Sequence, residues 1–165
     1  MLGAPPASLL VIGIGSELRG DDAAGRMVAA RVEALNLDGV RVRSVVQLVP
    51  ELVEDLASCT DVVFVDASLA CTVATTRWLE PTPGVAALTH HTTPEGLLGL
   101  AATVGVTPPR AALIAVPAPS LGLGDRLSVL SRAGIEQAVE LIARLHRARH
   151  APIRRSARRS RTGAA

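Results

Sequence analysis

Apolar residues along the chain gather into short unbroken runs separated by helically spaced sets. Residues 8–13 form a continuous apolar run too short for a helix, and residues 61–65 and 111–116 repeat this pattern. All three are therefore predicted to be buried strands. Residues 40–46 alternate valine with arginine, as a half-exposed strand does. Residues 72–88 contain two prolines and predict an edge strand followed by a surface loop.

Helical patterns fill the gaps between these strands. The first helix is predicted to begin at Asp21, whose carboxylate would cap it, and to end at residues 36–39. Its apolar face is predicted to comprise Ala23, Met27, Ala30, Val32 and Leu35. The other helices are predicted to begin at Pro50, at residues 93–95, and at Asp125 or Ser128, the last one ending near His146.

Strands that alternate with helices predict an α/β fold. Right-handed crossovers would build a mostly parallel, twisted sheet with helices on both faces, which is a three-layer sandwich. Apolar residues make up 48% of the chain, but it has one Trp, one Phe and no Tyr, so the core is predicted to consist of Val, Leu, Ala and Ile. At 165 residues the chain fits a single domain. We predict a domain over residues 1–147 and a tail over residues 148–165.

Charge is distributed unevenly along the sequence. The net charge is +2, yet residues 144–165 hold eight of the 17 arginines and no acid, while nine arginines and 15 acids leave residues 1–143 at −6. The tail has too little apolar surface to fold alone, so a disordered, solvated extension is favoured over a nucleic-acid-binding arm. The scarcity of aromatic residues also argues against binding of single-stranded nucleic acid.

The two cysteines do not indicate a disulfide framework. Cys59 and Cys71 form no CxxC pair, and reduced thiols in a cytoplasmic protein are the simplest interpretation. No stretch reaches the roughly 18 to 20 apolar residues that a membrane span needs, and the first residues lack a basic segment followed by a long apolar run. A cytoplasmic protein without a membrane partner is predicted.

A glycine turn with two adjacent acids follows the first predicted strand. Such a turn usually binds phosphate, but Asp21 and Asp22 stand where the phosphate would lie and would repel it. A dinucleotide fingerprint would also need glycine where Leu18 stands, and the chain has no lysine for a phosphate-binding P-loop. The turn therefore predicts metal ligands rather than a nucleotide site.

Further metal-ligating residues are expected at the same edge of the sheet, because loops meet outside the carboxyl ends of parallel strands. Asp66 follows a buried strand, and His90 and His91 precede the third long helix. Together with Asp22 they would form an oxygen and nitrogen site suited to a borderline divalent ion such as nickel, zinc or cobalt. One of the two histidines is expected to be an ordinary surface residue.

Structural alternatives stand beside each of these assignments. Asp21 is better suited to a helix cap than to a metal site, and Asp66 could instead accept backbone hydrogen bonds in a loop. Gln47 could orient a partner or simply end a strand. Cys71 could act as a nucleophile only beside a base that ionises it, and a small buried residue is the favoured interpretation.

Several motifs, taken together, resemble one protein family. Residues 13–25 read GIGSELRGDDAAG and are similar to the pattern GxGNxLxxDDGxG of the hydrogenase maturation endopeptidases. The resemblance runs from about residue 9 to residue 145, and Ser16 departs from the family's usual asparagine. Further matching segments, in the expected order, are residues 47–52, 63–68, 89–98 and 124–128.

The resemblance implies an endopeptidase that removes the C-terminal extension from the large-subunit precursor of a nickel–iron hydrogenase. The family's nickel-contacting and catalytic positions fall on Asp22, Asp66 and His90, although a one-residue shift would select His91. The nickel would be carried by the precursor and would act as its recognition element, no nucleotide cofactor is implied, and a monomer is expected. Two alternatives stay open, namely a non-cleaving nickel-site sensor or chaperone and a nucleotide-binding oxidoreductase.

Overall fold

Five strands form a single sheet in a computed structural model that describes residues 7–83, 92–124 and 126–150. The strand order is β2-β1-β3-β5-β4. The first four strands in this order are parallel, and β4 is antiparallel to β5 at the edge. The strands are β1 (Ala7–Ile14), β2 (Val40–Val45), β3 (Cys59–Ser68), β4 (Thr75–Leu79) and β5 (Arg110–Pro117). The structure confirms the predicted, mostly parallel sheet. It also confirms the edge strand predicted within residues 72–88, which is β4.

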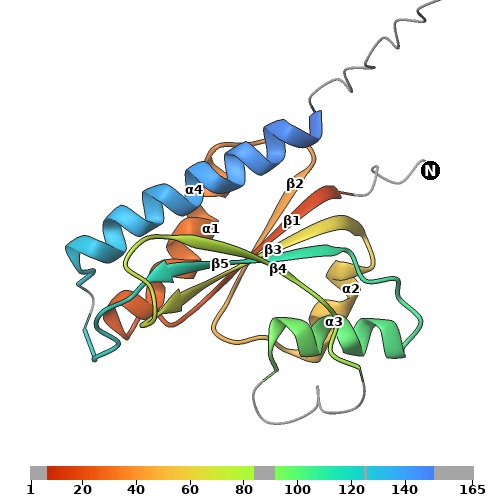
Figure 1. Ribbon diagram of the computed structural model, residues 1–165, viewed down its shortest axis with the longest axis horizontal. Helices are drawn as coiled ribbons and strands as arrows, with labels where there is room; N and C mark the ends of the chain where they lie inside the picture. The colour runs from red at the N-terminus through yellow and green to blue at the C-terminus, as the bar shows by residue number, and fades with distance from the viewer. Residues whose placement is uncertain (1–6, 84–91, 125, 151–165) are drawn as a thin grey trace, which may run out of the picture.

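Helices cover both faces of the sheet, which confirms the predicted three-layer α/β domain. Figure 1 shows α1 and α4 on one face and α2 and α3 on the other. The α-helices are α1 (Ala24–Ala34), α2 (Val53–Leu56), α3 (Pro94–Thr103) and α4 (Val129–His150). Short 3₁₀ turns, η1 (Gly20–Ala23) and η2 (Pro50–Leu52), precede α1 and α2.

The sheet is buried on both sides because successive side chains of a strand point to opposite faces. In β1, Leu10 and Ile12 belong to the core beneath α2 and α3, whereas Leu9 and Val11 belong to the core beneath α1 and α4. Both faces of the strand must therefore be apolar, which explains the unbroken run in the sequence. The single phenylalanine, Phe64 in β3, is fully buried in the first of these cores.

The buried face of α1 differs from the predicted one. The 3₁₀ turn delays the start of the helix, so the residues packed against the sheet are shifted along it. Ala30 and Leu35 were expected in the core but are exposed. The buried residues of α1 are Ala24, Gly25, Val28, Ala29 and Val32.

Two elements extend beyond their predicted ends. β3 continues past Val65 to Ser68 because its ladder with β5 continues as far as Pro117, so Asp66 lies within the strand rather than in a loop. α4 continues past His146 to His150, three residues into the predicted tail. There Arg149 forms an ion pair with Asp61 and donates a hydrogen bond to Thr60, which ties the end of the helix to the start of β3. The remainder of the predicted tail lies outside the described residues.

Within the described ranges, no helix combines the length and the apolar character needed to cross a lipid bilayer.

Candidate functional site

The chain turns back sharply after β1 and brings Asp22 to the end of that strand. Gly15 adopts a φ of 144°, and a Cβ at this position would lie 1.8 Å from the carbonyl oxygen of Asp22, so only glycine fits here. The backbone N–H of Ser16 donates a 2.9 Å hydrogen bond to Oδ2 of Asp22. The main chain of residue 16 makes this contact, so it does not depend on the asparagine side chain found in the family.

Asp21 does not cap the helix, contrary to the prediction. It is fully buried, and its two carboxylate oxygens accept hydrogen bonds from the N–H of Ser120 at 3.1 Å and from the N–H of Ser128 at 2.7 Å. The residue at the start of the 3₁₀ turn, Arg19, makes no side-chain cap bond. Asp21 therefore fastens the glycine turn to the segment that joins β5 to α4.

Close packing of α1 brings the acidic turn next to β3. A Cβ on Gly25 would lie 2.3 Å from the carbonyl oxygens of both Ile14 and Val65. The first turn of the helix therefore rests on the main chain of β1 and β3 with no side chain between them. Because Asp66 follows Val65 directly, the two acids are brought to the same edge of the sheet.

Asp66 lies in an environment that disfavours its charge. Burial raises the pKa of its carboxyl above the ordinary value, the hydrogen bond from the N–H of Ala67 (2.8 Å) opposes this, and the negative charge of Asp22 raises it further. No basic side chain forms an ion pair with Asp22 or Asp66 among the residues that the structure describes. The site therefore holds two carboxylates whose repulsion a cation would relieve.

The two acids line one pocket of about 320 Å³. Gln47, two residues after the end of β2, lines the same pocket. Thr93 caps α3 by accepting a hydrogen bond from the N–H of Gly96 at 3.1 Å, so the start of that helix forms one wall. The lining residues are Ile14, Gly15, Asp22, Val46, Gln47, Leu48, Asp66, Thr92, Thr93 and Pro94.

The predicted histidine ligands, His90 and His91, lie outside the described residues. Within residues 7–83, 92–124 and 126–150, no three His, Cys, Asp or Glu side chains gather as a metal site would require. The structure thus brings Asp22 and Asp66 into one pocket, which Thr92, the residue after His91 in the sequence, also lines.

Comparison with known proteins gives a consistent result at the level of structure. No protein-family model matches the chain, and no curated protein sequence matches it significantly. Among solved structures, the NiFe hydrogenase maturation protease HycI from Thermococcus kodakarensis is 28% identical, with a TM-score of 0.64, over 86% of this chain and 93% of that one. A hydrogenase 2 maturation peptidase from a Thaumarchaeota archaeon is 27% identical, with a TM-score of 0.62, over 84% and 97% of the two chains.

A third relative extends the match to bacteria. The hydrogenase maturating endopeptidase HybD from E. coli is 25% identical, with a TM-score of 0.60, over 86% of this chain and 93% of that one. The chain is thus similar in sequence and fold to several hydrogenase maturation proteases. It is accordingly a peptidase, as the motif series implied, and the oxidoreductase alternative is not supported.

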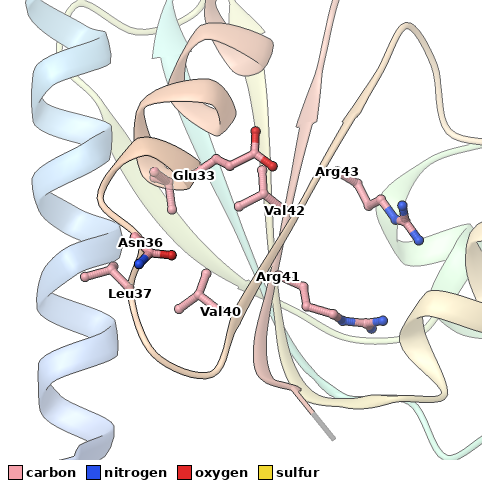
Figure 2. Close-up of a pocket in the computed structure, with 8 residues that line it drawn as sticks. Glu33, Asn36, Leu37, Val40, Arg41, Val42 and Arg43 are labelled. Carbon is pink, nitrogen blue, oxygen red and sulfur yellow. The ribbon is translucent and has the colours of Figure 1, made fainter. Parts of the chain in front are cut away.

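A second pocket, of about 360 Å³, lies between the end of α1 and β2, away from the acid pair. Figure 2 shows Arg41 and Arg43 extending from β2 away from Asn36 and Leu37. Both arginines are already engaged by Asp55, Arg43 through hydrogen bonds of 2.8 to 3.1 Å to its carboxylate. The lining of this pocket holds a single acid, Glu33, so the pocket has no counterpart of the Asp22 and Asp66 pair.

Neither cysteine of the protease belongs to the acid pocket. Both thiols are free, as predicted. Burial raises the pKa of the Cys59 thiol to about 11, so it is protonated at neutral pH. The sulfur of Cys71 lies 3.8 Å from the carbonyl oxygen of Ala115, and no base adjoins it among its described contacts. The structure thus gives no support to a nucleophilic Cys71, but the residue is half-buried rather than buried as expected.

Proposed function

We propose that the chain is an endopeptidase that removes the C-terminal extension from the large-subunit precursor of a nickel–iron hydrogenase after nickel has been inserted. The observation that carries this proposal is the shared pocket of Asp22 and Asp66, which has no basic partner among the described residues. Similarity to solved hydrogenase maturation proteases supports the reaction class and the kind of substrate. The nickel is part of the substrate, and the protease recognises it.

The donor atoms present fit this cargo. Asp22 and Asp66 supply carboxylate oxygens, and His90 is the proposed nitrogen donor, with His91 as the alternative one residue away. His90 precedes Thr92 of the pocket wall by two residues. Oxygen and imidazole ligands suit a borderline divalent ion, and an incomplete set leaves room for ligands from the precursor.

The carboxylates would act by positioning and by proton transfer. The bond from Ser16 fixes one oxygen of Asp22, a residue that lines the pocket, and the other oxygen would contact the nickel. Shared contact with the nickel would hold the precursor's C-terminal segment against the two acids, so the cleavage step would not need a separate encounter. One of the two carboxylates would accept the proton of the water that attacks the peptide carbonyl.

The proposal further takes the protease to be a cytoplasmic monomer, because a folded partner needs a free docking face. Size-exclusion chromatography with light scattering tests the oligomeric state. A stable dimer that covers the Asp22 pocket would contradict this part of the proposal.

The test is processing of nickel-loaded and nickel-free precursor, followed by intact mass of the large subunit. We expect the parent protein to shorten only the nickel-loaded form. Folded Asp22→Ala and His90→Ala variants should lose processing, whereas Asp38→Ala, which removes an exposed acid at the other end of the sheet, should retain it. Parent-rate processing by Asp22→Ala would refute the proposed role. A precursor that binds but keeps its C-terminus would identify the non-cleaving sensor instead.

A further inference from the structure

Asp66 lines a further cavity besides the pocket that it shares with Asp22. This cavity has a volume of about 370 Å³, and we call it the sheet cavity. The residues of its lining that the argument uses are Asp66, Ser68, Thr75, Arg77, Leu113 and Ala115. The pocket of the two acids is lined from the ends of β1 and β2 and the start of α3, whereas the sheet cavity is lined from β3, β4 and β5. Because β3 lies between β1 and β5, the two cavities meet at Asp66.

The register of the sheet arranges the lining in rows. Asp66 pairs with Ala115, and Ala115 pairs with Thr75, so these three residues form one row across β3, β5 and β4. Asp66 is two residues from Phe64, which is buried in the core beneath α2 and α3. Since alternate residues of a strand share a face, the row lies on that same face of the sheet, beyond the core.

The helices leave this end of the face partly uncovered. β5 lies inside the sheet, and its residues on the opposite face, Ile114 and Val116, are fully buried. Leu113 and Ala115 of the same strand are only half-buried, and Thr75 on the edge strand is exposed. An interior strand of a parallel sheet is normally covered on both faces. The floor of the sheet cavity is therefore an accessible apolar surface in the middle of the sheet.

Hydrogen-bonding groups adjoin this floor. The side chain of Arg77 is 58% exposed and forms an ion pair of 2.7 Å with Glu95 in the first turn of α3. A guanidinium has five N–H donors, more than one carboxylate uses. The hydroxyl of Ser68 accepts a 3.1 Å hydrogen bond from the N–H of Ala70, so its own O–H can donate. Because Glu95 balances the charge of Arg77, these donors suit the neutral carbonyl oxygens of a peptide main chain.

The position of Asp66 between the two cavities selects the occupant. The nickel belongs in the pocket that holds both acids, whereas the sheet cavity has Asp66 alone. A peptide whose scissile bond lies at Asp66 has the nickel-bearing body on one side and the segment to be removed on the other. The row from Asp66 to Thr75 spans two strand spacings, about 10 Å, which is the length of about three residues of extended chain.

We propose that the sheet cavity binds the first residues of the precursor's C-terminal extension, as an extended peptide that crosses from Asp66 over Ala115 to Thr75. This inference rests on the proposed function and adds the site that recognises the extension. Arg77 and Ser68 donate hydrogen bonds to carbonyl oxygens of the peptide, and its inward side chains contact the apolar floor. Binding there contributes to the transition state of cleavage without belonging to the reacting centre.

The first test fills the sheet cavity from the edge strand. Thr75→Trp adds a large side chain over the row, and tryptophan is well suited to a strand. With nickel-loaded precursor, this variant should lower kcat/KM for processing at least tenfold, because the extension loses its binding site. A parent-like kcat/KM in folded Thr75→Trp would overturn the inference.

Two variants serve as controls for the substitution at Thr75. Thr107→Trp adds the same bulk at an exposed threonine that precedes β5, at the other end of that strand. Thr75→Ser keeps the hydroxyl and adds no bulk. Both should keep kcat/KM within twofold of the parent value. Circular dichroism and thermal unfolding would verify that all variants are folded.

A second substrate tests whether the lost binding energy belongs to the extension. Shortening the extension to one residue should lower kcat/KM at least tenfold for the parent protein and for Thr107→Trp. The same shortening should change kcat/KM less than twofold for Thr75→Trp, because the contact is already lost in that variant. Equal losses in the parent and in Thr75→Trp would show that the cavity does not bind the extension.

Cross-linking separates the cavity from the proposed function. A diazirine analogue of leucine at the third residue of the extension should, on irradiation with the parent protein, become attached to β4, as located by mass spectrometry of the linked peptides. Shortening of the precursor with links only outside β3, β4 and β5 would overturn the inference and leave the proposed function intact. Links to β4 without shortening of the precursor would uphold the cavity and overturn the proposed cleavage.

Discussion

The two ends of β3 shift the pKa of an aspartate in opposite directions. Asp61, near the amino end, would have its pKa raised by burial, but hydrogen bonds from Arg149 and Arg110 outweigh burial and lower it. The bond from Nε of Arg110 measures 2.8 Å. Asp66, five residues further along the strand, has no arginine partner in the described residues, and burial together with the charge of Asp22 raises its pKa.

The difference shows that neighbours decide what a buried aspartate does. At the amino end, paired charges join β3, β5 and the last turn of α4. At the carboxyl end, two like charges share a pocket without such compensation. A group held in an unfavourable ionisation state within a pocket is typical of a functional site, whereas a paired one is typical of a structural contact. The comparison therefore separates the end that we propose binds substrate from the end that supports the fold.

The largest expected effect distinguishes the two aspartates by activity. Asp66→Asn should reduce precursor processing by about 10³-fold or more, because under the proposed function it removes a carboxylate that contacts the substrate's nickel or accepts a proton. Asp61→Asn should retain processing within a fewfold factor. Single-turnover assays with nickel-loaded precursor measure both rates. Equal losses in the two variants would show that the two ends are not functionally distinct.

The second-largest effect concerns the buried carboxylate of Asp21. Asp21→Ala should lower the free energy of unfolding by about 2 to 3 kcal/mol, because the N–H groups of Ser120 and Ser128 lose their acceptor. Asp21→Asn keeps one acceptor oxygen and should lose less. Urea denaturation followed by circular dichroism measures the change. A loss no larger than that of Asp38→Ala would contradict the assigned role.

Asp61→Asn should destabilise the fold by about 1 to 2 kcal/mol at neutral pH, since its two arginines lose a charged partner. The pKa of Asp61 is lowered in the folded state, so its stabilising contribution is complete above the unfolded pKa of about 3.9 and is lost as pH falls through the folded pKa. The stability difference between parent and variant should therefore narrow below about pH 4. A constant difference from pH 7 to pH 3 would contradict the ion-pair explanation.

The smallest expected effect is a gain in stability rather than a loss. The pKa of Asp66 is raised in the folded state, so ionising its carboxyl group lowers the free energy of unfolding. This loss of stability is absent below the unfolded pKa. It appears as the pH rises through the folded pKa. Asp66→Asn should therefore stabilise the metal-free protein at pH 7 by about 0.5 kcal/mol. Differential scanning calorimetry at pH 3 and pH 7 measures the stability difference between the variant and the parent protein. Destabilisation at pH 7 would show that the carboxylate is better accommodated than its pKa implies.

The sheet could be predicted from the sequence, as could two side chains of the candidate site, Asp22 and Asp66. Apolar runs identified the buried strands, and the acids that follow β1 and end the buried part of β3 lie in one pocket because parallel strands end at one edge. The role of Asp21 could not be predicted, because its partners lie 99 and 107 residues away and are main-chain N–H groups. The length of α4 likewise depends on Arg149 reaching Asp61, a contact that no local pattern encodes.

The glycine contact beneath α1 has a consequence for engineering this protein. Because Gly25 rests directly on the carbonyl oxygens of Ile14 and Val65, main-chain atoms set the spacing between Asp22 and Asp66. Substitution of lining residues such as Gln47 and Thr93 can therefore reshape the pocket while the spacing of the acids stays fixed. Widening the separation of the acids themselves would require rebuilding the junction between helix and sheet.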